Sequence, residues 1–157
     1  MIKDYIEYGN YKIYFRTSYF YKLRFFKKNM LPVSICIWDP KWYKGMSYKS
    51  LAPSKYDAET DCEQCIKEHS DDPGYYNLDC NYLKNYRKQL SYYNIERTLN
   101  DIIIKADKFY NFDEKNINNE IYIIFMGYEV SSKKCSERFE LSRWIEQEYF
   151  ISEISDL

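Results

Sequence analysis

Several features are scarce in this chain of 157 residues, and each scarcity excludes a class of protein. Only four glycines and four prolines occur, which excludes a collagen-like or linker-like chain. No run of about 18 apolar residues is present, so the sequence predicts no membrane partner. The opening residues MIKDYIEYGN lack the apolar core of a signal peptide, and we therefore expect a cytoplasmic protein.

Recognisable catalytic motifs are also missing. His69 is the only histidine, which excludes metal sites that need two histidines. The chain contains no GxGxxG, GxxxxGK[ST], HExxH or GxSxG motif. The sequence therefore favours neither an enzyme nor a non-enzymatic protein.

Aromatic residues are abundant instead, at 20% of the chain, and 19 of them are tyrosines. Together with many Ile, Lys and Asn, this is the composition that AT-rich codons produce, as in a low-GC bacterium or its phage. Tyrosine rings can be buried in a core while their hydroxyls form hydrogen bonds. Exposed rings can also stack on nucleobases, so both interpretations stay open.

A net charge of −1 conceals a strong asymmetry. Between Lys12 and Lys55 there are ten basic residues and one acid, Asp39, whereas residues 57–79 contain eight acids and one lysine. The basic segment also carries four aromatic residues, Trp38, Trp42, Tyr43 and Tyr48. Such a segment is typical of a surface that binds phosphates and stacks bases, or it pairs with the acidic segment of the same chain.

Hydrophobic patterning predicts one α/β domain over residues 1–157, with a small, mostly parallel sheet flanked by helices. Alternating runs over residues 2–8 and 11–16 flank Gly9-Asn10 and indicate an N-terminal hairpin, which we expect Thr17-Ser18-Tyr19 to end. Apolar runs at 33–38 and 121–126 are typical of buried strands. We expect helices over residues 56–70, after caps at Asp79 and Asn94, and over 137–150, with a polar connection at 111–119.

The junction after the strand at 121–126 is the first candidate site, because ligands of open α/β sheets bind outside the carboxyl ends of the strands. Glu129 could act as a general base, Cys135 at a helix start as a nucleophile, and Arg138 as a phosphate clamp. Alternatively, Ser136 only caps the helix while Glu129 and Arg138 form a structural ion pair. Seven residues from three strand ends complete the expected ligand pocket, namely Thr17, Ser18, Tyr19, Trp42, Lys44, Tyr48 and Tyr128, together with Ser136.

Cys62, Cys65, His69 and Cys80 form a second candidate site. Three thiolates and an imidazole are a legitimate tetrahedral zinc set, although their spacing matches no common zinc finger. The alternative is free thiols in a reducing compartment. Zinc is therefore a possible cofactor, and Cys36 is expected in the core.

Three stretches resemble a bacterial and phage family known as "domain of unknown function 488". They are Ile13-Tyr-Phe-Arg-Thr-Ser-Tyr-Phe20, the segment from Pro32 to Ser54 with its Trp-Tyr-Lys-Gly and Leu-Ala-Pro motifs, and Ile123-Ile-Phe-Met-Gly-Tyr-Glu129 with Lys134-Cys-Ser-Glu-Arg138. The likeness spans residues 12–148, leaving 1–11 as an extension and 149–157 as a tail. Gly127 and Ser136 stand where the family has Cys and His. The resemblance implies a single α/β domain and brings no established reaction.

Taken together, the sequence predicts a protein that binds a phosphate-bearing ligand, either a nucleotide derivative or a nucleic acid, at the carboxyl ends of its strands. One alternative is a non-enzymatic phage or mobile-element protein that binds a protein partner or sequesters a small molecule. The other is a nucleic-acid adaptor stabilised by zinc.

Overall fold

A computed structural model describes residues 4–53, 81–127 and 137–149, and these form one α/β domain. Its centre is a five-stranded sheet in the order β1-β2-β5-β3-β4. Only β1 is antiparallel to its neighbour, which confirms a mostly parallel sheet with an N-terminal hairpin. The strands are β1 (Ile6–Tyr8), β2 (Tyr11–Tyr19), β3 (Met30–Ser34), β4 (Met46–Ser47) and β5 (Glu120–Gly127).

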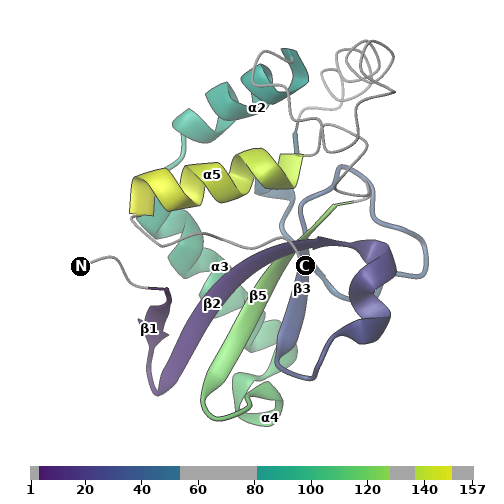
Figure 1. Ribbon diagram of the computed structural model, residues 1–157, viewed down its shortest axis with the longest axis vertical. Coiled ribbons are helices and arrows are strands. Elements are labelled where there is room, and N and C mark those ends of the chain that lie inside the picture. Colours follow the sequence, from purple (N-terminus) through teal and green to yellow (C-terminus); the bar gives the residue numbers. More distant parts are fainter. Residues whose placement is uncertain (1–3, 54–80, 128–136, 150–157) are drawn as a thin grey trace.

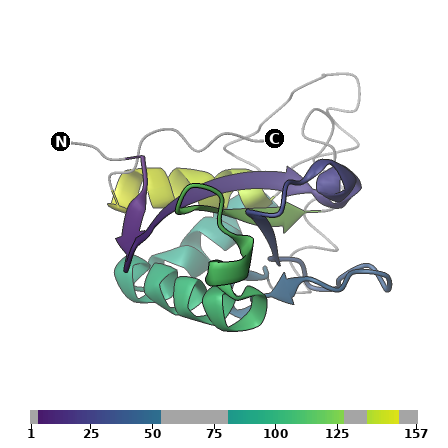
Figure 2. The same ribbon diagram turned by 90° about the horizontal axis from the view of Figure 1, so that it is seen from below.

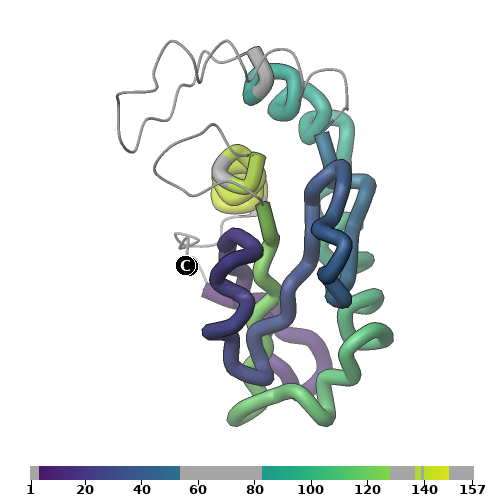
Figure 3. Tube along the Cα trace, turned by 90° about the vertical axis from the view of Figure 1, so that its right-hand side faces the viewer, coloured from purple at the N-terminus to yellow at the C-terminus, as the bar shows by residue number. Residues whose placement is uncertain are grey.

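Helices lie beside the sheet and beyond its upper end (Figure 1). Figures 2 and 3 show α3 along one side of the sheet, and the start of α5 next to the end of β5. None of the helices in the described ranges is both long and apolar enough to cross a bilayer. The helical elements are the 3-10 helices η1 (Phe20–Phe25) and η2 (Lys49–Leu51), and the α-helices α2 (Asn81–Ser91), α3 (Ile95–Tyr110), α4 (Phe112–Lys115) and α5 (Glu137–Tyr149).

The two faces of the sheet have different environments, because alternate side chains of a strand point to opposite faces. One face carries the main core, in which Phe15 and Phe125 stack with ring centroids 5.9 Å apart. The buried residues Leu99, Ile102 and Ile103 of α3 belong to the same core. The opposite face has a smaller cluster, consisting of Phe20, Cys36, Ile124 and Met126.

The N-terminal hairpin forms where Gly9-Asn10 predicts it. Gly9 has φ +57°, a left-handed conformation that favours glycine in a two-residue turn. The expected interruption at residues 17–19 is wrong, because β2 continues to Tyr19, which pairs with Gly127 of β5. Pairing with a long central strand thus extends β2 through polar residues that local patterning treats as a turn.

The expected limits of the next strand are also wrong, since β3 covers Met30–Ser34 and not residues 33–38. Pro32 lies inside β3, although proline cannot donate a backbone hydrogen bond. Strand β4 pairs only with Val33 and Ser34, so it does not reach Pro32. The carbonyl of Pro32 instead accepts hydrogen bonds from the hydroxyls of Tyr43 and Tyr110, at 3.2 and 2.5 Å.

Helix α3 begins at the cap that the sequence predicts, because the Asn94 side chain accepts a hydrogen bond from the Arg97 amide at 3.0 Å. The polar connection at 111–119 contains the short helix α4, whose Phe112 is fully buried. Burial of Phe112 and the hydrogen bond from its amide to Asp107 order a segment whose composition otherwise predicts a loop. The helix expected at 56–70 and the cap at Asp79 lie outside the described residues.

Candidate functional site

The carboxyl ends of β2, β5 and β3 lie side by side, as a ligand site at one sheet edge requires. Tyr19 is in register with Gly127, and Ser34 with Met126. Thr17 and Ser18 are buried, with 1% and 0% of their surface exposed, so they belong to the interior below this edge.

Arg138 is in the first turn of α5 and is fully buried. The carbon at the centre of its guanidinium group lies 5.7 Å from the centroid of the Tyr19 ring, a cation–π contact that joins α5 to the end of β2. Glu137 and Cys36 are buried next to each other, with 3.8 Å between Sγ and Oε1. The described structure therefore places Arg138 where it positions Tyr19 and presents no surface of its own.

Asp39 organises the loop that follows β3. The hydroxyls of Ser34 and Ser47 both donate to its carboxylate, and Lys49 Nζ lies 3.3 Å from Oδ1. Lys49 also donates to the carbonyl of Cys36 at 2.8 Å. The single acid of the basic segment is thus held by this network.

The 3-10 helix η1 exposes aromatic rings and cations together. Tyr21 and Phe25 have 60% and 62% of their surface exposed. The Arg24 guanidinium carbon lies 4.0 Å from the Tyr21 ring centroid, and Lys22 Nζ lies 5.9 Å from that of Phe25. Tyr19 and Tyr21 stack at 12° with centroids 6.4 Å apart. These contacts arrange cations and flat rings side by side on one surface.

The loop after β3 adds two exposed tryptophans to this region. Trp38 and Trp42 are 54% and 60% exposed, and Trp42 packs edge-on against Phe20 at the start of η1, 6.2 Å away. Both segments lie on the same side of the molecule, at the right in Figures 1 and 2. We call this region the basic aromatic surface; it comprises Tyr21, Lys22, Arg24, Phe25, Lys27, Lys28, Trp38, Lys41, Trp42 and Lys44.

Tyr48 lies away from this surface, against α3. Its hydroxyl donates to Asp101 at 2.6 Å, and Lys105 Nζ lies 5.3 Å from its ring centroid. The hydrogen bond from Tyr48 lowers the pKa of Asp101, while burial raises the pKa of Tyr48 itself. Tyr48 therefore connects β4 and η2 to α3, and the structure does not bring it together with Trp42 and Lys44.

The remaining predicted site residues lie outside the described residues. These are Tyr128, Glu129, Cys135 and Ser136 after β5, and the zinc candidates Cys62, Cys65, His69 and Cys80. Within the described ranges, no group of three or more His, Cys, Asp or Glu residues is arranged to hold a metal ion. Cys36 is buried in the smaller cluster, as expected.

Sequence reasoning did not select the residues of η1 as site residues. The signal was present as an alternation of aromatic and basic residues over Tyr19–Lys28, within the segment already recognised as basic. Local patterning does not show that these side chains stay exposed. Their exposure depends on how η1 packs against the sheet, which is a tertiary property.

Comparison with known proteins adds no relative. No protein-family model matches the chain, and neither a curated protein nor a solved structure was found to match it. The fold and the basic aromatic surface therefore define the protein only as an α/β domain, and the resemblance to the family "domain of unknown function 488" stays a prediction.

Proposed function

We propose that this protein binds single-stranded nucleic acid through the basic aromatic surface, which η1, the residues that follow it and the loop after β3 form. The observation that carries the proposal is the coincidence of charge and exposed rings. Among the described residues, seven large hydrophobic side chains are exposed, and four of them lie between Tyr21 and Trp42.

Charge supports a polyanionic ligand. Six of the nine basic residues in 12–53 belong to the basic aromatic surface. The single acid of this range, Asp39, is engaged by two serines and Lys49. Phosphates along a nucleic-acid strand are attracted to such a surface through the release of their counterions. Because the cations extend over η1 and the loop after β3, a strand with successive phosphates matches them better than a single nucleotide does.

The exposed rings favour a single strand over a duplex. Bases of a single strand are free to stack on aromatic side chains, a contact that contributes about 1–3 kcal/mol per base. Tyr21 and Phe25 present their rings beside Arg24 and Lys22, and Trp42 packs against Phe20 of the same helix, so bases and phosphates are bound at neighbouring positions.

Fluorescence anisotropy of labelled oligothymidine and oligouridine tests the charge contribution. We expect the triple variant Lys22→Gln, Arg24→Gln, Lys27→Gln to bind at least about tenfold more weakly at low salt, because it loses three phosphate partners. The matched control removes three cations from other helices, Lys88→Gln, Lys108→Gln and Lys115→Gln, and should bind within about twofold of the wild type.

The stacking contribution needs a second pair of variants. Trp42→Ala should weaken binding at least about fivefold, whereas Tyr92→Ala removes a ring that is 76% exposed at the end of α2 and should have no effect. The proposal is wrong if neither oligonucleotide binds the wild type, or if both triple variants weaken binding equally. Failure of nucleic-acid binding would favour the alternative of a protein partner.

A further inference from the structure

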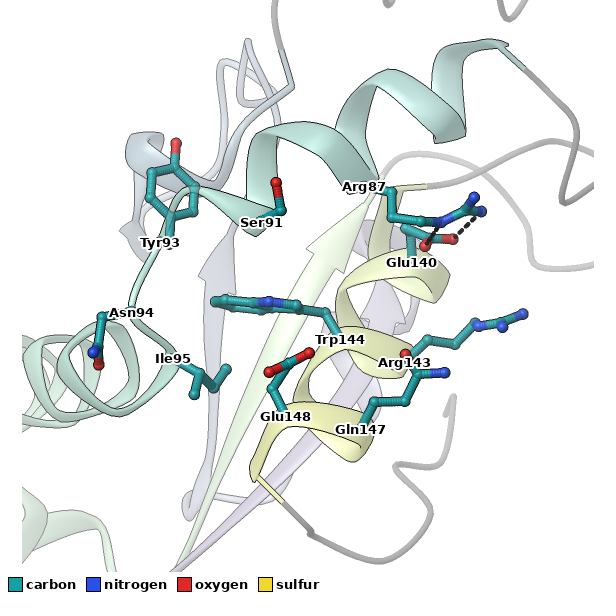
Figure 4. A pocket seen from close by; sticks show the side chains of 10 residues that line it. All are labelled: Arg87, Ser91, Tyr93, Asn94, Ile95, Glu140, Arg143, Trp144, Gln147 and Glu148. Atoms are coloured by element: carbon teal, nitrogen blue, oxygen red, sulfur yellow. Dashed lines mark hydrogen bonds and ion pairs between the residues drawn. The ribbon is translucent and has the colours of Figure 1, made fainter.

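A second site lies in a hollow between α2, the beginning of α3 and α5 (Figure 4). Its volume is about 650 Å³. The lining residues used below are Ser91, Tyr93, Asn94, Ile95, Trp144 and Glu148. None of them belongs to the basic aromatic surface, so this site is independent of the proposed function.

The indole of Trp144 forms one wall of this hollow. Trp144 is half-buried and extends from α5 toward the turn between α2 and α3, near Ile95 (Figure 4). Across the described ranges, no aromatic ring stacks on the indole and no cation lies over it, in contrast to the rings of Tyr19, Tyr21 and Tyr48. The indole packs partly against the main core and also lines the hollow, so the part that the core does not cover is available to a ligand.

Glu148 supplies a negative charge beside that face. It follows Trp144 by four residues, so both side chains lie on the same side of α5. Glu148 is exposed and forms no hydrogen bond or ion pair in the described part of the chain. On this side of the hollow the other lining groups are neutral, namely a serine, a tyrosine, an asparagine and an isoleucine.

The two arginines that line the hollow, Arg87 and Arg143, do not neutralise the negative charge of Glu148. Arg87 is already engaged by Glu140, with 2.5 Å between Nε and Oε1. Arg143 extends from α5 in the other direction, beside Gln147 (Figure 4). The charge available near the indole is therefore negative.

We propose that this hollow binds an organic cation, an alkylammonium or guanidinium group, on the face of Trp144 with Glu148 as its counter-ion. An aromatic face attracts a cation through its quadrupole, and a neighbouring carboxylate adds Coulomb attraction. The cation can come from a small molecule or from a lysine or arginine side chain of another protein, and the experiment distinguishes these sources.

The test uses the full chain with Trp38→Phe and Trp42→Phe, which leaves Trp144 as the single tryptophan. Its fluorescence is titrated with choline, with the neutral isostere 3,3-dimethyl-1-butanol, and with the peptides acetyl-Gly-Arg-Gly-amide and acetyl-Gly-Gln-Gly-amide. We expect a saturable change with choline or the arginine peptide, at a Kd of about 1–10 mM, and none with the neutral partners. A response to choline alone identifies a small-molecule cation, and a response to the peptide alone identifies a protein side chain.

Two variants connect the response to the site. Glu148→Gln should weaken binding of the cation at least about threefold. Glu114→Gln, the same change on α4, should leave the affinity for the cation unaltered. The proposal is overturned if no cation gives a saturable response, if the neutral isostere binds equally well, or if Glu148→Gln binds as the parent does. Circular dichroism of each variant confirms that the helices are intact.

Discussion

Among single residues, several tyrosines connect parts of the chain that are distant in sequence, through hydrogen bonds of their hydroxyls. The hydroxyl of Tyr86 donates to the carbonyl of Leu51 at 2.6 Å, and that of Tyr93 donates to Ser50 at 2.7 Å. Both bonds join α2 and the turn after it to η2. The high tyrosine content thus supplies rings that pack in the core and hydroxyls that satisfy backbone carbonyls.

Tyr110→Phe tests this role directly. The Tyr110 hydroxyl accepts a hydrogen bond from the Met46 amide at 2.9 Å and donates to the carbonyl of Pro32. Its removal takes this acceptor from the Met46 amide, while the Pro32 carbonyl keeps the hydroxyl of Tyr43, so we expect the free energy of unfolding to fall by about 1–3 kcal/mol. Chemical denaturation measures the loss, and Tyr92→Phe, at an exposed position, should leave stability unchanged. Equal stability of both variants would contradict the structural role of Tyr110.

At the scale of elements, the features predicted correctly are those that depend on neighbouring residues. The hairpin at Gly9 and the cap at Asn94 follow from local backbone chemistry. The limits of β3 and the 3-10 helix η1 could not be predicted, because they depend on pairing with β5 and on packing of Phe20 against Tyr43 and Trp42. Tertiary contacts decide these positions and leave little trace in local patterning.

Asn94→Ala tests the cap of α3. The variant loses the hydrogen bond from Asn94 to the Arg97 amide, and we expect it to be destabilised by about 1 kcal/mol. Asn100→Ala is the matched control, because Asn100 is exposed inside the same helix and alanine has the higher helix propensity. Thermal and urea denaturation should therefore show no loss for the control. A stable Asn94→Ala variant would show that α3 depends on its packing alone.

At the scale of the whole molecule, the asymmetric charge and the parallel sheet could both be predicted. Which of the predicted site residues lie on the surface of the fold, and which lie inside it, could not be predicted. The sequence placed Thr17, Ser18, Arg138 and Trp42 in one pocket, whereas the structure buries the first three and exposes the fourth. Burial depends on how η1 and α5 cover the sheet edge, which is a property of the assembled fold.

Stability at alkaline pH is a further property of the whole fold. Burial raises the pKa values of Tyr86 and Tyr43 above 10.0, so these groups stay protonated in the folded chain when they ionise in the unfolded chain. Their contribution to the free energy of unfolding is complete below pH 10. It decreases as the pH rises further, because the unfolded state then binds fewer protons than the folded state.

A comparison of the wild type with Tyr86→Phe isolates one such group. Above pH 10, the stability advantage of the wild type should shrink by about 1.4 kcal/mol per pH unit, since only the unfolded wild type gains by ionising Tyr86. Urea denaturation at several pH values measures this change. A constant advantage between pH 9 and pH 11 would contradict a raised pKa.

The salt dependence of nucleic-acid affinity shows whether the basic aromatic surface binds phosphates. The measurement is the affinity of the wild type for a labelled single-stranded oligonucleotide over a series of KCl concentrations. If the basic aromatic surface holds about three to five phosphates, log K should fall against log[KCl] with a slope of about −2 to −3.5. The triple variant at η1 should show a slope that is smaller by about 2. No binding at low salt, or a slope near zero for the wild type, would contradict phosphate binding by the basic aromatic surface.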